Sequence, residues 1–140
     1  MRKSLFFLFI IALFLLTACS SKNILPEEKA NEVVDTYGIT MITVTIDTKE
    51  QKEALNVSFS EKKERSEAEY VNKIDNVYLH GEQAVNKLME VFSNHEMNPD
   101  MDETELIKRI SEAFEIHDFK MIRLQITFKG YDSKEIMMTK

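Results

Sequence analysis

The sequence predicts a two-layer α+β domain, in which a mostly antiparallel sheet is covered on one face by two amphipathic helices. Two observations lead to this fold class. Apolar and polar residues alternate over residues 39–60 and again over residues 119–139, a pattern typical of strands with one buried face. Between these segments, apolar residues recur at intervals of three and four, a pattern typical of helices with one buried stripe. The predicted order is β-β-(β)-α-α-β-β, with about four or five strands.

The first two strands are predicted at residues 39–47 (ITMITVTID) and 54–60 (ALNVSFS), where apolar residues alternate with Thr, Asn and Ser. The polar segment between them, DTKEQK, predicts an antiparallel hairpin. A third strand is predicted at residues 67–75, with Tyr70 and Ile74 in phase. The residues of the first two strands that are expected to face inward are Ile42, Val44, Ile46, Leu55, Val57 and Phe59.

The first helix is predicted from about Gly81 to Asn94 and the second within residues 102–116, on either side of the helix-breaking sequence NPD. Asp102, with Glu105 three residues later, predicts a capping box at the start of the second helix. The two apolar stripes consist of Ala84, Val85, Leu88, Val91 and Phe92 in the first helix, and of Leu106, Ile107, Ile110, Ala113 and Phe114 in the second.

Two further strands are predicted at residues 119–130 and 134–139, and the residues expected to face inward are Ile122, Leu124, Ile126 and Phe128. Polar side chains would then form a broad surface on the other face, provided that their strands are neighbours. These side chains are Thr43, Thr45, Asn56, Ser58, Arg123, Gln125 and Thr127. An exposed antiparallel sheet, or its edge, can receive a strand from a partner. The simpler interpretation is an ordinary solvated face.

The N-terminus carries the most specific signal in the chain. Arg2 and Lys3 precede an apolar run from Leu5 to Leu16, which is too short to span a membrane and suits the apolar part of a signal peptide. The sequence Leu16-Thr17-Ala18-Cys19 follows, with the only cysteine of the chain at its end. This arrangement resembles the signal of bacterial lipoproteins.

The resemblance implies cleavage between Ala18 and Cys19, an S-diacylglycerol thioether on Cys19 and, as is often found in this class, acylation of the new amino group. The alternatives are a secreted protein in which Cys19 has no role, and a chain held by an uncleaved apolar helix. We therefore expect a signal peptide at residues 1–18, a lipidated cysteine and flexible tether at residues 19–37, and the folded domain at residues 38–140. A flexible tether of this length would span roughly 20–25 Å on average. Pro26 could instead begin a short helix through Val33 and Val34, although two valines give only a thin apolar face.

The composition of the chain argues against some classes of partner and some kinds of binding site. Removal of residues 1–18 takes away two basic residues and no acid, which leaves 16 basic and 24 acidic residues and a net charge of −8. An acidic domain is a poor partner for nucleic acid, so none is expected. Three glycines are too few and too scattered for a phosphate-binding loop or a dinucleotide fingerprint. No catalytic motif is present, and we expect neither an enzyme nor a cofactor.

Three segments of the chain resemble the YusW-like family of small bacterial envelope proteins. They are VYLHGEQAVNKLMEVF, LIKRISEAFEI and FKMIRLQITFKG, and the sharpest part is L-x-G-E-x-A-x-x-K-L. The resemblance extends over about Ile39 to Thr139. It implies the fold and a Gram-positive source, in which the outer face of the cell membrane is the destination. It implies no catalytic residue.

Two weaker hypotheses concern metal ions. Asp100, Asp102 and Glu105, with His95 nearby, offer oxygen and nitrogen ligands for a divalent cation, although acids at a helix N-terminus also cap amides. Thioethers of Met97 and Met101 beside His95 suit Cu(I), although methionines commonly fill gaps in a core. His80 and His117 fall in no catalytic or metal-binding spacing. The predicted function is a membrane-anchored, non-enzymatic module that binds an envelope protein or wall component, with a metal or small-ligand binder as the alternative.

Overall fold

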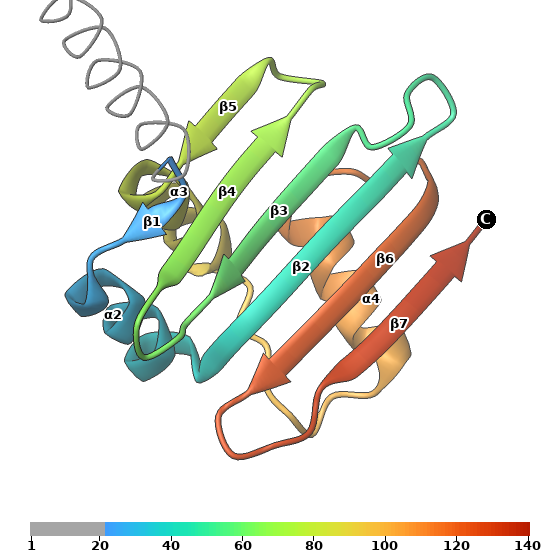
Figure 1. Ribbon diagram of the computed structural model, residues 1–140. Helices are drawn as coiled ribbons and strands as arrows, with labels where there is room; N and C mark the ends of the chain where they lie inside the picture. Colours follow the sequence, from blue (N-terminus) through green and yellow to red (C-terminus); the bar gives the residue numbers. More distant parts are fainter. Residues whose placement is uncertain (1–21) are drawn as a thin grey trace, which may run out of the picture.

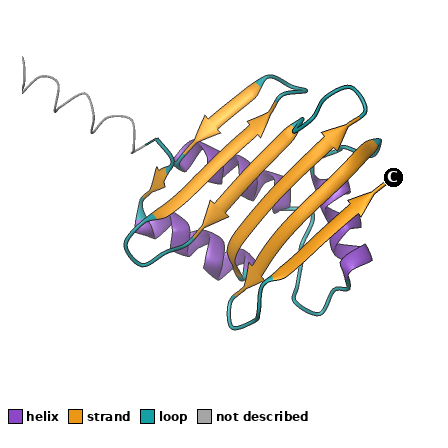
Figure 2. Cartoon of the chain, turned by 45° about the vertical axis from the view of Figure 1, so that its right-hand side comes forward, coloured by secondary structure: helices purple, strands orange, loops and turns teal. Residues whose placement is uncertain are grey.

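A computed structural model describes residues 22–140. In this part of the chain one antiparallel sheet forms the front layer, and the helices all pack on its other face (Figure 1, Figure 2). The elements in chain order are β1 (Ile24–Leu25), α2 (Glu27–Tyr37), β2 (Ile39–Thr48), β3 (Leu55–Ser60), β4 (Ser66–Asn72), β5 (Val77–His80), α3 (Glu82–Phe92), α4 (Glu103–Ala113), β6 (Phe119–Phe128) and β7 (Lys134–Thr139).

The sheet is built around two ten-residue strands, β2 and β6, which lie side by side at its centre. The strand order is β1-β4-β3-β2-β6-β7, and β5 also pairs with β4. β1 and β5 both lie along the outer side of β4, β1 at its start and β5 at its end. The sheet therefore has a composite edge of β1 and β5 on one side and a single edge strand, β7, on the other.

The predicted inward-facing residues form the core. The pairs Ile42–Ile126, Val44–Leu124 and Ile46–Ile122 lie opposite one another in β2 and β6. Leu55, Val57 and Phe59 of β3 are buried on the same side, as is Phe128 of β6. The helices cover these side chains with the apolar stripes predicted from the sequence. The buried residues of the two stripes are Ala84, Val85, Leu88, Phe92, Leu106, Ile107, Ile110 and Phe114.

The capping box predicted for the second helix is present at the start of α4. The backbone N–H of Glu105 donates to Asp102 Oδ1 at 2.8 Å, and the N–H of Asp102 donates to Glu105 Oε2 at 3.2 Å. Two amides that have no partner within the helix are satisfied in this way.

The α+β class and the mostly antiparallel sheet are confirmed, but the predicted count of four or five strands is wrong. Within residues 22–140 the sheet has seven strands, because β1 and β5 add to those predicted. The third predicted strand is β4, in which Tyr70 is buried. Ile74 lies beyond the end of β4 and is 53% exposed. The chain turns at Asn76, which has a φ of 57°, and returns as the short strand β5.

The prediction of a flexible tether up to residue 37 is also wrong for residues 24–37, which form β1 and α2. The helix has a narrow apolar face of Ala30, Val33 and Val34, all buried. Tyr37 extends this face: its ring packs edge-to-face on Phe92, and its hydroxyl donates to a backbone oxygen of α3 at 2.9 Å. Burial raises the pKa of Tyr37, and the charges of nearby acids raise it further. These contacts add a third helix to the two predicted.

Replacement of Val33 by Ala tests whether α2 belongs to the folded domain. Val33 is 1% exposed within the hydrophobic core, so the loss of two methyl groups should lower the free energy of unfolding by about 2 kcal/mol. Asp35→Ala on the exposed side of the same helix is the control and should change it by less than about 0.5 kcal/mol. Denaturant unfolding of the full chain measures both values. Equal stability of the two variants would contradict the packing of α2 in the core and support a flexible tether.

Candidate functional site

The sheet face opposite the helices, here called the open face, brings together the polar residues that the sequence predicted there. Thr43 of β2 lies between Ser58 of β3 and Gln125 of β6. In the next row, Thr45 lies between Asn56 and Arg123. Thr127 continues the surface one row further, opposite Met41. None of the seven predicted side chains is buried. The predicted polar surface therefore exists.

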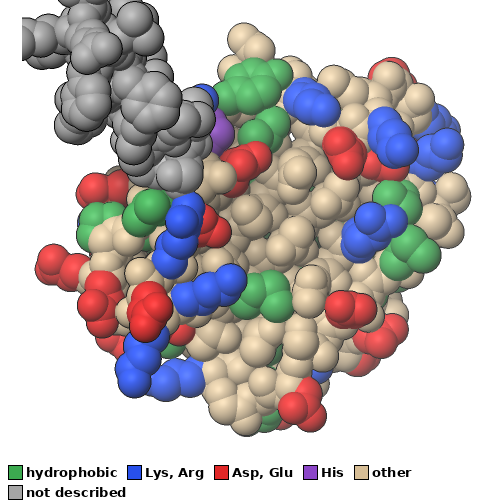
Figure 3. Space-filling model, in the orientation of Figure 1, with side chains coloured by type: hydrophobic (Ala, Val, Ile, Leu, Met, Phe, Trp, Pro, Cys, Tyr) green, Lys and Arg blue, Asp and Glu red, His purple; other side chains and the backbone are tan. Residues whose placement is uncertain are grey.

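Charged side chains lie mainly around the rim of the open face. Its middle is formed by uncharged polar side chains and backbone, which appear as the broad tan area in Figure 3. Glu67 and Glu69 of β4 lie toward one edge of the sheet, and Arg123 and Glu135 toward the other. The face thus offers hydroxyl and amide groups at its centre and ionic contacts at its margins.

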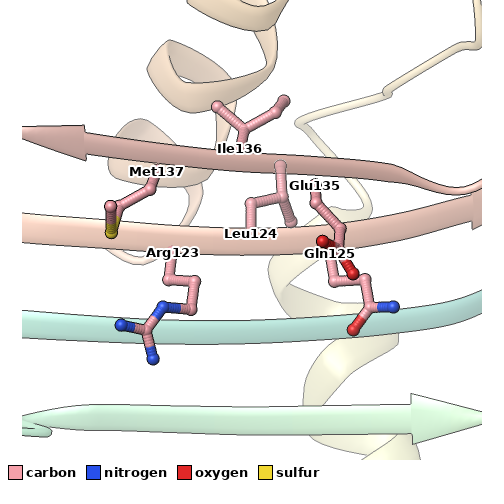
Figure 4. A pocket seen from close by; sticks show the side chains of 6 residues that line it. All are labelled: Arg123, Leu124, Gln125, Glu135, Ile136 and Met137. Carbon is pink, nitrogen blue, oxygen red and sulfur yellow. The ribbon is translucent and has the colours of Figure 1, made fainter.

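A shallow hollow of about 460 Å³ lies where the open face meets the edge strand β7 (Figure 4). Side chains of two neighbouring strands line it: Arg123, Leu124 and Gln125 come from β6, and Glu135, Ile136 and Met137 from β7. Met137 is 63% exposed, the highest value among the large apolar side chains of residues 22–140. This margin of the open face therefore combines an exposed apolar group with one charge of each sign.

A hydrogen-bonded cluster at the opposite edge holds the start of the described chain. The amide of Asn23 donates to Glu69 Oε2 at 3.1 Å, and its oxygen lies 2.7 Å from Nδ1 of His80. The backbone oxygen of Asn23 accepts the N–H of Ala68 at 2.8 Å. At Gly81 a Cβ atom would lie only 3.0 Å from the Ile24 carbonyl oxygen, so glycine permits the close approach of β1. The sequence predicted none of this, because the partners lie far apart in the chain.

One comparison with known proteins gives a match. The family model described as YusW-like protein matches residues 43–130. This chain belongs to the YusW-like family. The matched region runs from β2 to the turn after β6, within the stretch on which the resemblance was drawn. Searches of curated proteins and of solved structures found no match.

The acidic residues considered as metal ligands do not converge in the YusW-like chain. Asp102 and Glu105 bind each other's backbone amides in the capping box. Asp100 uses its backbone N–H in a turn with Asn98. Within residues 22–140, no three His, Cys, Asp or Glu side chains lie close enough together to hold a metal ion.

The histidines and methionines considered as ligands are spread over the YusW-like domain. Met97 is buried in the hydrophobic core, and Met101 packs against it. Nδ1 of the neighbouring His95 is buried without a hydrogen-bond partner among the described residues. His80 binds Asn23, whereas the backbone oxygen of His117 accepts the ammonium of Lys140 at 3.1 Å. Packing thus accounts for both methionines.

The predicted cleavage and lipidation sites, Ala18 and Cys19, lie outside the described residues. None of the helices in the described part of the chain has both the length and the apolar character needed to cross a membrane.

Replacement of Asn23 by Ala tests the cluster that holds β1. Loss of its two side-chain contacts should lower the free energy needed to open β1 locally by about 1 kcal/mol. The rate of amide hydrogen exchange at Ala68 should then rise about fivefold. The amide of Lys73, which bonds to Ala54 at 2.8 Å, serves as the control and should not change. Hydrogen exchange followed by NMR measures both amides. Equal acceleration at the two amides would mean a general loss of stability and not a local one.

Proposed function

We propose that this YusW-like chain is a lipoprotein on the outer face of the cell membrane, and that its small domain binds an envelope protein or wall component without catalysing a reaction. The proposal for the anchor rests on residues 1–19. The basic start, the apolar run of about twelve residues and the Leu-Thr-Ala-Cys order all match the signal of bacterial lipoproteins. A diacylglyceryl group with a further acyl chain is enough for stable anchoring.

The observation that carries the binding role is the open face. Every helix of the described chain lies on the other side of the sheet, so residues 22–140 leave one face of the multistranded sheet uncovered (Figure 2). Its centre is lined with hydroxyl and amide side chains, which donate and accept hydrogen bonds. A binding surface of this kind needs no cofactor and suits a protein or wall component better than a small molecule, since its hollows are shallow and open.

The ordered start of the domain supports a definite orientation on the membrane. Asn23 is bonded into the sheet, so four residue steps separate it from Cys19, and a chain of this length reaches at most about 14 Å. A lipid on Cys19 would therefore hold the edge formed by β1 and β5 next to the headgroups. The edge strand β7 lies at the other end of the strand order and would face away from the membrane.

The anchor is tested by the intact mass of the chain extracted from bacterial membranes. We expect a mass equal to residues 19–140 plus the diacylglyceryl and acyl groups, because the signal peptide would be removed before Cys19. The matched variant Cys19→Ala should remain as the uncleaved precursor. An unmodified cysteine in the wild-type chain would rule out the anchor.

The binding role is tested by photo-crosslinking in living cells. A benzoylphenylalanine residue replaces Thr43 at the centre of the open face, Met137 on β7, or Glu28 on the exposed side of α2 as the control. We expect a covalent adduct with a defined envelope component from Thr43 or Met137 and none from Glu28. Adducts at no position, or equally at all three, would contradict a specific binding surface.

A further inference from the structure

Within residues 22–140, the outer edge of β7 has backbone hydrogen-bonding groups that no other strand uses. Lys140 N–H donates to the Lys120 carbonyl of β6 at 3.0 Å, and bonded pairs alternate with non-bonded pairs in an antiparallel ladder. The N–H and C=O groups of Glu135, Met137 and Thr139 therefore point away from β6. β7 ends the strand order, so no further strand of residues 22–140 pairs with these groups. An added strand would find three residues ready to form a ladder.

Hollows flank this edge on both faces of the sheet. The hollow described above lies on the open face beside Met137 (Figure 4). A second hollow of about 400 Å³ lies on the helix side between α4 and the end of the sheet, and its apolar lining includes Ile107, Phe119 and Met138. Because the side chains of a strand alternate between the two faces, a strand added to β7 would place every second side chain against this apolar lining. The middle of β7, Ile136-Met137-Met138, is itself apolar.

Positive charge marks both ends of the same edge. Lys134 donates to the backbone oxygens of Pro99 and Met101 at 2.8 and 3.1 Å, which fixes it at the start of β7. Lys140 at the other end lies 4.1 Å from the centre of the Phe119 ring. Both residues share the helix side of the sheet with Ile136, since they are an even number of positions from it. A chain with a net charge of −6 thus carries a lysine at each end of its free strand.

We propose that β7 binds an extended peptide segment of a partner protein, which adds to the sheet as a further strand. The segment has apolar side chains facing α4 and an acidic residue opposite each of Lys134 and Lys140. This inference rests on the proposed binding function and names the mode and the chemistry of recognition. Backbone bonds to Glu135, Met137 and Thr139 supply affinity, and the apolar hollow together with the lysines at the two ends of β7 selects the sequence.

A second copy of this chain fits the edge less well. If two β7 strands paired antiparallel about Met137, Lys134 of each copy would lie opposite Lys140 of the other on the helix side. Two pairs of like charges would then oppose each other across the new ladder. An acidic partner has the opposite effect, because it places a carboxylate opposite each lysine.

The probe for this site is the heptapeptide Glu-Thr-Val-Thr-Val-Thr-Glu, labelled for fluorescence polarisation and titrated with the full chain in detergent. Paired with residues 134–140, it places its glutamates opposite the two lysines and its valines opposite Ile136 and Met138. We expect saturable binding, weakened about tenfold when both glutamates of the peptide are replaced by lysine. Equal binding of the two peptides, or binding of neither, would overturn the proposal.

Met137→Pro tests the edge directly, because it removes an N–H that points outward and leaves the bonds to β6 in place. We expect peptide binding to weaken about tenfold or more. Thr139→Pro removes another outward N–H near the end of the strand and gives the same test if Met137→Pro fails to fold. The control is Tyr78→Pro, which removes an outward N–H at the opposite edge and should leave peptide binding unchanged.

Four further outcomes separate this proposal from its alternatives. Sedimentation that shows a wild-type dimer, lost in Met137→Pro, would mean that a second copy occupies the edge, and would overturn the proposal. Peptide binding unaffected by either β7 variant would overturn it as well. Crosslinks from Thr43 without peptide binding would leave the proposed binding function intact while ruling out the β7 edge. Peptide binding without any crosslink in cells would support the peptide site on β7 but contradict the proposed binding function.

Discussion

One-sided burial of the central strand pair is the constraint on which the rest of the structure depends. β2 and β6 carry apolar side chains at alternate positions, and their register places Ile42, Val44 and Ile46 opposite residues of the same kind. A sheet with one dry face needs cover on that face alone. The helices therefore gather on one side, and the polar residues between the apolar ones are left together on the other. The open face and the buried core come from the same alternation.

The strong periodicities of the chain were enough to predict this centre. The alternation in β2, β3 and β6 extends over many residues, as do the apolar stripes of α3 and α4. Each pattern can therefore be recognised in the sequence without knowledge of the tertiary structure. The polar side chains of the open face could be grouped for the same reason. The elements that were missed are short or incomplete by themselves. β1 has two residues and β5 has four, and both become strands only because β4 offers an edge.

The missed parts of the candidate sites depend on contacts between distant residues. α2 has too few apolar residues to be recognised alone, and Tyr37 secures it through contacts with α3. Asn23 and His80 are 57 positions apart, and no local pattern links them. The free edge at β7 could not be identified either, because a sequence does not state which strand lies outermost. A sheet order that places β7 last is a property of the folded chain.

The way in which β1 joins the sheet has a mechanical consequence. If Cys19 is fixed in the membrane, a force on a bound partner enters the domain through residues 22–25, which are held to β4 by the two-residue pairing of β1 and by the hydrogen bonds of Asn23. A strand pulled from its end releases its bonds in turn, so β1 would detach first and α2 next. Release of residues 22–37 adds up to about 55 Å of chain while β2 to β7 stay paired. A lipid on Cys19 would thus be joined to the domain by a connection that lengthens under load, and the surfaces proposed to bind a partner lie in the part of the domain that would unfold last.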